Sequence, residues 1–190
     1  MKRNIYSNTP KSILIAFALV FFAQIGLAQF TVSGLVETPN GNQSTGLAIL
    51  VSGTENKIVY TNSNGEYSFT LQAGGAYNIQ PLSCEENSLN GVTTYDMVLI
   101  TRHYEGVENL DSPYKIIAAD LDNSNSLGLQ DTSIIRKLIL GIINEFPLGN
   151  NRFVLKNYVF PDPLDPFSPA FPESYSISNL QSNLTGIDFI

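Results

Sequence analysis

Two segments of this chain repeat one another at a spacing of 35 residues, and that repeat strongly limits what the central part can fold into. In both copies, residues 91–106 and 126–141, the sixth residue is aspartate and the last is glycine. Equal spacing at both ends indicates that one structural unit is duplicated. Since glycine usually follows a helix end, each copy is predicted to be a loop followed by a helix.

Side chains within the two copies support this prediction. Thr93 and Asp96 are three residues apart, which is the spacing of a capping pair at a helix start. The second copy carries an apolar stripe at helical spacing, made by Ile134, Ile135, Leu138 and Ile139. The capping pair predicts a helix start in the first copy, and the stripe predicts an amphipathic helix in the second.

The loop before the second predicted helix, residues 120–131, carries oxygen-bearing residues at alternate positions. Calcium prefers about six to eight oxygen ligands, and a tight loop can turn alternate oxygens inward. The expected ligands are the side chains of Asp120, Asp122 and Ser124, the backbone carbonyl of Ser126, and Asp131, which stands where an EF-hand loop places its last acidic ligand. The sequence therefore predicts a Ca²⁺ site here.

Several positions in this loop depart from the EF-hand pattern. Asn125 stands at the sharp turn that favours glycine, although asparagine tolerates left-handed backbone better than most residues. Ser124 replaces a stronger acidic ligand, and Gly128 offers no side chain, so affinity in the micromolar range or weaker is expected. Leu127 stands where such loops place an apolar residue into the core. The alternative is an Asx-rich turn that needs no metal.

The loop of the first copy, residues 85–96, is poorer in ligands. Glu85, Asn87 and Asp96 fall at ligand positions, but Leu89 falls where an oxygen is wanted. Calcium binding by the first loop is therefore left open, because its shell would depend on backbone oxygens and water.

Residues 30–81 read as short strands between turns, as in an all-β sandwich. Residues 66–71 alternate polar and apolar side chains strictly, and a turn at residues 62–65 ends in glycine. Residues 32–36 and the hairpin at residues 61–69 resemble the carboxypeptidase-regulatory-like and Cna-B-like sandwiches of secreted bacterial proteins. That resemblance implies a spacer or binding module.

The two loop–helix copies, over about residues 85–143, resemble type I dockerin domains, most closely those of exported multidomain proteins from Bacteroidetes-type bacteria. The resemblance implies two calcium-bound loop–helix units that dock onto a cohesin domain in assemblies for polysaccharide breakdown. The family's recognition residues correspond by position to Thr94, Tyr95, Thr101, Arg102, Leu129, Gln130, Arg136 and Lys137. The asymmetry between the copies makes docking in two orientations doubtful.

The start of the chain resembles a secretory signal peptide. Three basic residues, Lys2, Arg3 and Lys11, precede or border an apolar run at residues 13–23, and small residues follow up to Ala28. Cleavage after Ala28 is favoured over a membrane anchor because the apolar run is shorter than the roughly 20 residues of a spanning helix. The protein is thus expected to be secreted or at the cell surface, with no membrane span after cleavage.

Charge and reactive residues limit the function classes. The net charge of −7 argues against nucleic-acid binding, which needs a basic surface. Cys84 is the one cysteine, so no internal disulfide can form, and it is expected to be a linker thiol. His103 is the one histidine and lacks partners at triad or zinc spacing, so no catalytic residues and no enzyme activity are expected.

After residue 145 the sequence is rich in loops, with five prolines in residues 160–172. Its aromatic residues, Tyr158, Phe160, Phe167 and Phe171, are expected to pack onto the core, the alternative being an exposed platform for sugars. The chain ends in a strand-like pattern that stops midway, so truncation is expected.

The predicted fold class is multidomain β plus α. It comprises a signal peptide (1–28), an Ig-like or prealbumin-like β-sandwich (29–82), a dockerin-like duplicated EF-hand-like unit (83–145) and a loop-rich tail (146–190). Two functions remain open. One is a calcium-binding docking module, and the other is a carbohydrate- or surface-binding accessory fragment in which the sandwich binds or acts as a spacer.

Overall fold

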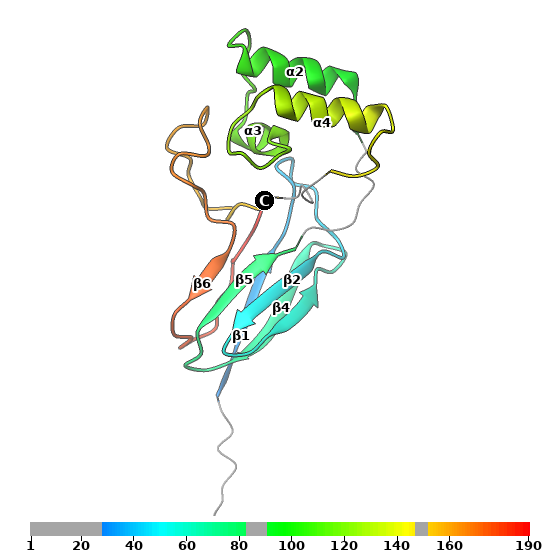
Figure 1. Cartoon of the computed structure of the whole chain (residues 1–190). Coiled ribbons are helices and arrows are strands. Elements are labelled where there is room, and N and C mark those ends of the chain that lie inside the picture. The colour runs from blue at the N-terminus through cyan, green and yellow to red at the C-terminus, as the bar shows by residue number, and fades with distance from the viewer. Residues whose placement is uncertain (1–27, 83–90, 147–151) are drawn as a thin grey trace, which may run out of the picture.

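The computed structural model describes residues 28–82, 91–146 and 152–190, and Figure 1 shows strands in one part and helices in the other. In the first sheet, β1 (Gln29–Leu35) pairs antiparallel with β4 (Glu66–Gln72). The second sheet has the order β3-β2-β5-β6, formed by β3 (Lys57–Tyr60), β2 (Ala48–Gly53), β5 (Tyr77–Pro81) and β6 (Tyr175–Ile177), all antiparallel.

Strict alternation of side chains builds β4, as the sequence predicts. Tyr67, Phe69 and Leu71 are buried, whereas the residues between them are exposed. The preceding turn forms as expected, with Gly65 at a φ of 74° and the backbone N–H groups of Asn64 and Glu66 donating to Asn62 Oδ1. The hairpin prediction is nevertheless right only for the turn, because β3 and β4 on its two sides belong to different sheets.

One apolar core lies between the two sheets, so the arrangement is compatible with a β-sandwich. Val32 of β1 and Leu71 of β4 come from the first sheet, and Ile49, Val51 and Ile79 come from the second; all five are fully buried. Side chains from both sheets therefore share one interior, which is the condition for two sheets to stabilise each other.

Residues 152–190 complete this core instead of forming a tail of their own, which differs from the predicted division at residue 146. β6 pairs with β5, and isolated parallel bridges join Val32 to Leu184 and Val36 to Phe189. Four residues of this segment are buried in the core: Ile177, Leu180, Ile187 and Phe189. The chain thus leaves the sheets after β5, forms the helices, and returns to the same sheets.

Three helices occupy the part of the chain described between residues 91 and 146: α2 (Thr94–Tyr104), α3 (Pro113–Ala119) and α4 (Leu129–Ile139). α2 and α4 have 11 residues each and keep the offset of the sequence repeat. Both end in the same way. Gly106 and Gly141 have φ values of 70° and 66°, and the residue after each glycine donates to a carbonyl five residues back. The duplication of a loop–helix unit is therefore visible in the backbone.

The helices have a core of their own that includes three residues of the predicted stripe, Ile134, Ile135 and Ile139. Ile134, Ile135 and Leu138 of α4 are buried, and Ile139 is half-buried. α4 packs against α2, and the two helices run side by side in Figure 1. This pairing buries one face of each helix and leaves the other face of each exposed.

α3 was not expected from the sequence, and it connects the helices to the returning segment. Its Ile117 packs with Val154 and Phe171 in a small separate core. Aromatic rings pack on one another here, with the centroids of neighbouring rings 5.1–6.4 Å apart; they belong to Tyr114, Tyr158, Phe160, Phe167 and Phe171. The expectation that the aromatic residues after residue 145 pack internally is confirmed.

The described residues thus form a mixed, sheet-rich fold with few helices and antiparallel sheets. None of the helices described in residues 28–82, 91–146 and 152–190 is long and apolar enough to cross a membrane.

A substitution at Phe189 tests whether residues 152–190 belong to the folded core. Phe189 is 0% exposed, so Phe189→Ala is expected to lower the free energy of unfolding by about 3–5 kcal/mol through lost burial and a cavity. Val159→Ala is the control, since Val159 is 82% exposed and should cost no more than about 0.5 kcal/mol. Urea unfolding measures both, and equal values would show that this segment is a dispensable appendage.

Candidate metal centre

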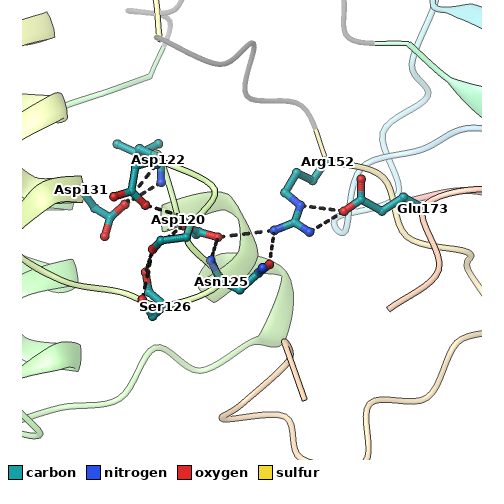
Figure 2. Close-up of polar contacts among 9 residues, drawn as sticks. Asp120, Asp122, Asn125, Ser126, Asp131, Arg152 and Glu173 are labelled. Atoms are coloured by element: carbon teal, nitrogen blue, oxygen red, sulfur yellow. Dashed lines mark hydrogen bonds and ion pairs between the residues drawn. The ribbon is translucent and has the colours of Figure 1, made fainter. Parts of the chain in front are cut away.

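Three aspartates of the loop between α3 and α4 bring their carboxylates together. Asp120 ends α3, Asp122 follows within the loop, and Asp131 stands in the first turn of α4. One carboxylate oxygen from each lies within 4.8 Å of the others, and Figure 2 shows the three side chains gathered at one place. The predicted ligands therefore converge, as a cation site requires.

Two of these carboxylates are deeply buried. Asp120 and Asp131 are each 1% exposed, although both are acidic. Burial raises the pKa of the Asp120 carboxyl, and the neighbouring Asp131 raises it further, against the lowering by N–H groups of Asn125 and Ser124 and by Arg152. Two negative charges buried side by side repel one another, and a nearby positive charge stabilises them.

The loop backbone turns so that its N–H groups point at Asp120. Asn123 and Asn125 adopt left-handed conformations, with φ values of 52° and 60°. The N–H of Ser124 donates to Asp120 Oδ1 at 2.9 Å, and that of Asn125 donates to Oδ2 at 3.0 Å. The expectation that Asn125 makes the sharp turn in place of glycine is confirmed.

Asp131 ties the two ends of the loop together. Its Oδ1 accepts hydrogen bonds from the N–H groups of Leu121 at 2.8 Å and Asp122 at 3.4 Å. Its Oδ2 accepts one from the N–H of Gly128 at 2.8 Å, which also satisfies a free donor at the start of α4. One carboxylate thus fixes both the beginning of the loop and the helix that follows.

The two serine positions complete the predicted ligand set. Ser124 Oγ lies 3.5 Å from Asp120 Oδ1 and 3.1 Å from the backbone oxygen of Ser126, to which it donates. Leu127 packs against the helical core, as expected for its position in the loop. The five predicted ligand residues of this loop therefore lie in one small region.

The donor set fits calcium by its chemistry. It offers three carboxylates, a hydroxyl and a carbonyl, all hard oxygen donors, at loop positions 1, 3, 5, 7 and 12 of the EF-hand scheme. Sulfur and imidazole ligands, which favour zinc, are not part of this cluster. If Ca²⁺ binds here, these residues would hold it and its charge would offset the paired carboxylates.

Only part of the first loop lies within the described residues. Glu85 and Asn87 lie outside the described residues, as does Cys84. Asp96 lies at the start of α2, where its Oδ2 accepts hydrogen bonds from Thr93 N at 2.7 Å and Thr93 Oγ1 at 2.8 Å. The predicted capping pair is confirmed, and Asp96 stands at the same helix position as Asp131.

Arg152 is a component of the site that the sequence did not indicate. Its Nη1 lies 3.4 Å from Asp120 Oδ2 and 3.1 Å from Asn125 Oδ1, while its Nε donates to Glu173 Oε1 at 2.8 Å. Figure 2 shows the guanidinium between the loop and Glu173. Arg152 follows Asp120 by 32 residues in the sequence, so only the tertiary fold brings the two together.

The residues predicted to contact a partner lie on α2 and α4. Tyr95 is 63% exposed at the start of α2, and Leu129 is 72% exposed at the start of α4. Thr101 is half-buried, whereas the other predicted contact residues, Thr94, Arg102, Gln130, Arg136 and Lys137, are exposed. The structure thus leaves seven of the eight positions accessible to another molecule.

His103 lies in α2 and is half-buried. Its Nδ1 accepts a hydrogen bond from the N–H of Leu110 at 3.1 Å, which requires an unprotonated Nδ1. Burial lowers the pKa of the imidazole from its ordinary value of 6.5. The ring therefore helps to fix the chain after α2, and its contacts are those of a structural residue.

The titration of His103 has a predictable direction. Because the folded state disfavours protonation of the imidazole, the contribution of His103 to the free energy of unfolding should be fully present above pH 6.5. It should be lost as the pH falls from 6.5 through the lower pKa of the folded state. His103 is the sole histidine, so its NMR signals are unambiguous, and their midpoint should lie below 6.5. The same signals in concentrated urea are the control. A folded midpoint at or above the urea value would contradict the burial argument.

Comparison with protein-family models, with curated proteins and with solved structures found no match to this chain.

Proposed function

We propose that this protein is an exported, non-catalytic, calcium-binding docking module of dockerin type. The observation that carries the proposal is the convergence of Asp120, Asp122 and Asp131 within 4.8 Å, in a loop that leads into the second of two duplicated helices. A loop–helix repeat with hard oxygen ligands supports a metal-stabilised unit in preference to a catalytic one.

Calcium would act on stability through the buried carboxylates. Asp120 and Asp131 repel one another when both are ionised, and a divalent cation between them would turn that repulsion into attraction. A ligand that binds only the folded state stabilises it by mass action, by about 2.7 kcal/mol at a concentration one hundred times its Kd. In this proposal the ion organises the loop and thereby the position of α4.

The docking part of the proposal rests on the exposed faces of α2 and α4. Tyr95 and Leu129 present large apolar side chains at the two helix starts, and charged residues such as Arg102, Arg136 and Lys137 accompany them. Aromatic and arginine residues are common anchors in protein interfaces. We propose a cohesin-like domain, or a related component of a cell-surface or extracellular assembly, as the partner, with a link to polysaccharide catabolism.

The alternative function is a carbohydrate- or surface-binding fragment in which the sheets bind. One observation favours it: Ile58 and Tyr60 are 54% and 68% exposed on β3, at one edge of the second sheet. Both side chains point to the same face because they are two residues apart on a strand. An exposed aromatic ring can stack on a sugar, which is how such a face would recognise a glycan.

Calcium titration of the chain, after removal of the predicted signal peptide, tests the main proposal. Asp120→Asn together with Asp131→Asn should abolish the calcium-dependent rise in melting temperature and the binding heat, because two buried ligands lose their charge. The control is Asp111→Asn together with Asp162→Asn, which removes the same charge from exposed positions and should leave both readouts intact. A wild-type chain without any calcium response would exclude the proposed site.

A glycan-retention assay tests the alternative with the same chain. If the sheet face binds sugar, Tyr60→Ala should lose retention on at least one immobilised polysaccharide, because the exposed ring is removed. Val159→Ala, which trims an apolar side chain that is also well exposed, should keep the retention. Absence of wild-type retention across a broad polysaccharide panel would exclude this function.

A further inference from the structure

Arg152 occupies the junction between the acidic loop and the segment that returns to the sheets. Its guanidinium bridges Asp120 on one side and Glu173 on the other, and its side chain is only 18% exposed. The guanidinium also lies over the ring of Phe171, 4.6 Å from the ring centroid, and 5.8 Å from that of Phe167. These contacts hold the positive charge of Arg152 in a fixed place beside the loop.

The orientation of Asp120 does not depend on Arg152. Both carboxylate oxygens of Asp120 already accept N–H groups of their own loop, from Ser124 and Asn125 at 2.9 and 3.0 Å. The contact to Arg152 is longer, at 3.4 Å. What Arg152 adds to the site is therefore charge, and a fixed positive charge opposes the entry of a cation.

We propose that the charge of Arg152 couples cation binding in the loop to the packing of residues 152–173 against α3, and that each of these two events weakens the other. The proposal rests on the calcium site proposed above. Without the ion, Arg152 places a positive charge 3.4 Å from Asp120 and ties the loop to the returning segment. With the ion, Asp120 is neutralised by another partner, so its attraction for Arg152 weakens.

Thermodynamic linkage makes this opposition reciprocal. If Arg152 lowers the affinity of the loop for the cation, the bound cation must weaken the contact of Arg152 by the same factor. The contact carries Val154 and Phe171 with it, because these residues pack on Ile117 of α3 beside the guanidinium. Cation concentration would thereby adjust how firmly the helices are held to the sheets.

Charge substitutions at the bridge give opposite predicted shifts. Arg152→Gln removes the competing charge, so the Kd for Ca²⁺ measured by calorimetry should fall about threefold to tenfold. Arg152→Lys keeps the charge and should stay within about twofold of the wild type. Glu173→Gln removes the carboxylate that shares Arg152, which leaves more of its charge for Asp120, so the Kd should rise about twofold to threefold.

Lys156→Gln is the matched control. Lys156 forms an ion pair at 2.8 Å with Glu37, which also joins the returning segment to the sheets but does not involve the loop. Its removal should leave the Kd for Ca²⁺ within about 1.5-fold of the wild type if the effect of Arg152 is local. A general loosening of the fold would instead change the Kd of both variants.

The outcomes separate the coupling from the site itself. A calcium response in the wild type, with tighter binding in Arg152→Gln and weaker binding in Glu173→Gln, supports the coupling. A calcium response that is unchanged or weaker in Arg152→Gln overturns the coupling and leaves the calcium site in place. If Arg152→Gln does not fold, Glu173→Gln decides, and tighter or unchanged binding in that variant overturns the coupling. A wild-type chain without a calcium response overturns both.

Discussion

The arrangement of the helical part depends on the burial of two carboxylates beside one another. Asp120 and Asp131 are almost inaccessible to solvent, and both lie where α3 ends and α4 begins. Burial of paired negative charge is unfavourable unless hydrogen bonds or cations offset it. Here backbone N–H groups of the loop donate hydrogen bonds to the two carboxylates, and Arg152 lies beside Asp120 as a positive charge. The two aspartates thereby determine the shape of the loop.

This constraint reaches the sheets through Arg152 and the aromatic residues around it. Arg152 ties the loop to Glu173, and Phe171 packs on Ile117 of α3. A change in the charge of the loop would therefore alter the contacts of the segment that completes the core between the sheets. The helices and the sheets have separate cores, and a third, smaller core around Ile117, Val154 and Phe171 joins α3 to the returning segment.

Local patterns in the sequence predicted much of this structure. The repeat located α2 and α4, Thr93 and Asp96 form the expected cap, and Asn125 adopts the left-handed turn that its loop position requires. These features depend on neighbouring residues, whose spacing determines their geometry. The converging oxygens of the loop could be predicted for the same reason, because all of them lie within 12 positions of the chain.

Contacts between distant residues could not be predicted in this way. α3 has only seven residues, too few for a clear helical period, and it was missed. The strand pairing of residues 175–177 and the bridges made by Leu184 and Phe189 join short segments that prolines and turns separate, so their alternation is weak. Arg152 carries no local signal either, since its partners Asp120 and Glu173 lie 32 and 21 residues away.

The return of the chain beside its point of departure has a mechanical consequence. The chain enters the helices after β5 and comes back to form β6, and β5 and β6 are antiparallel neighbours, with Ile79 opposite Tyr175. Tension applied to the helices by a tethered molecule would be shared by two strands anchored side by side. Because β5 points toward the helices in Figure 1, a pull on the helices away from the sheets would act along β5, and the hydrogen bonds between β5 and β2 would resist together, in shear.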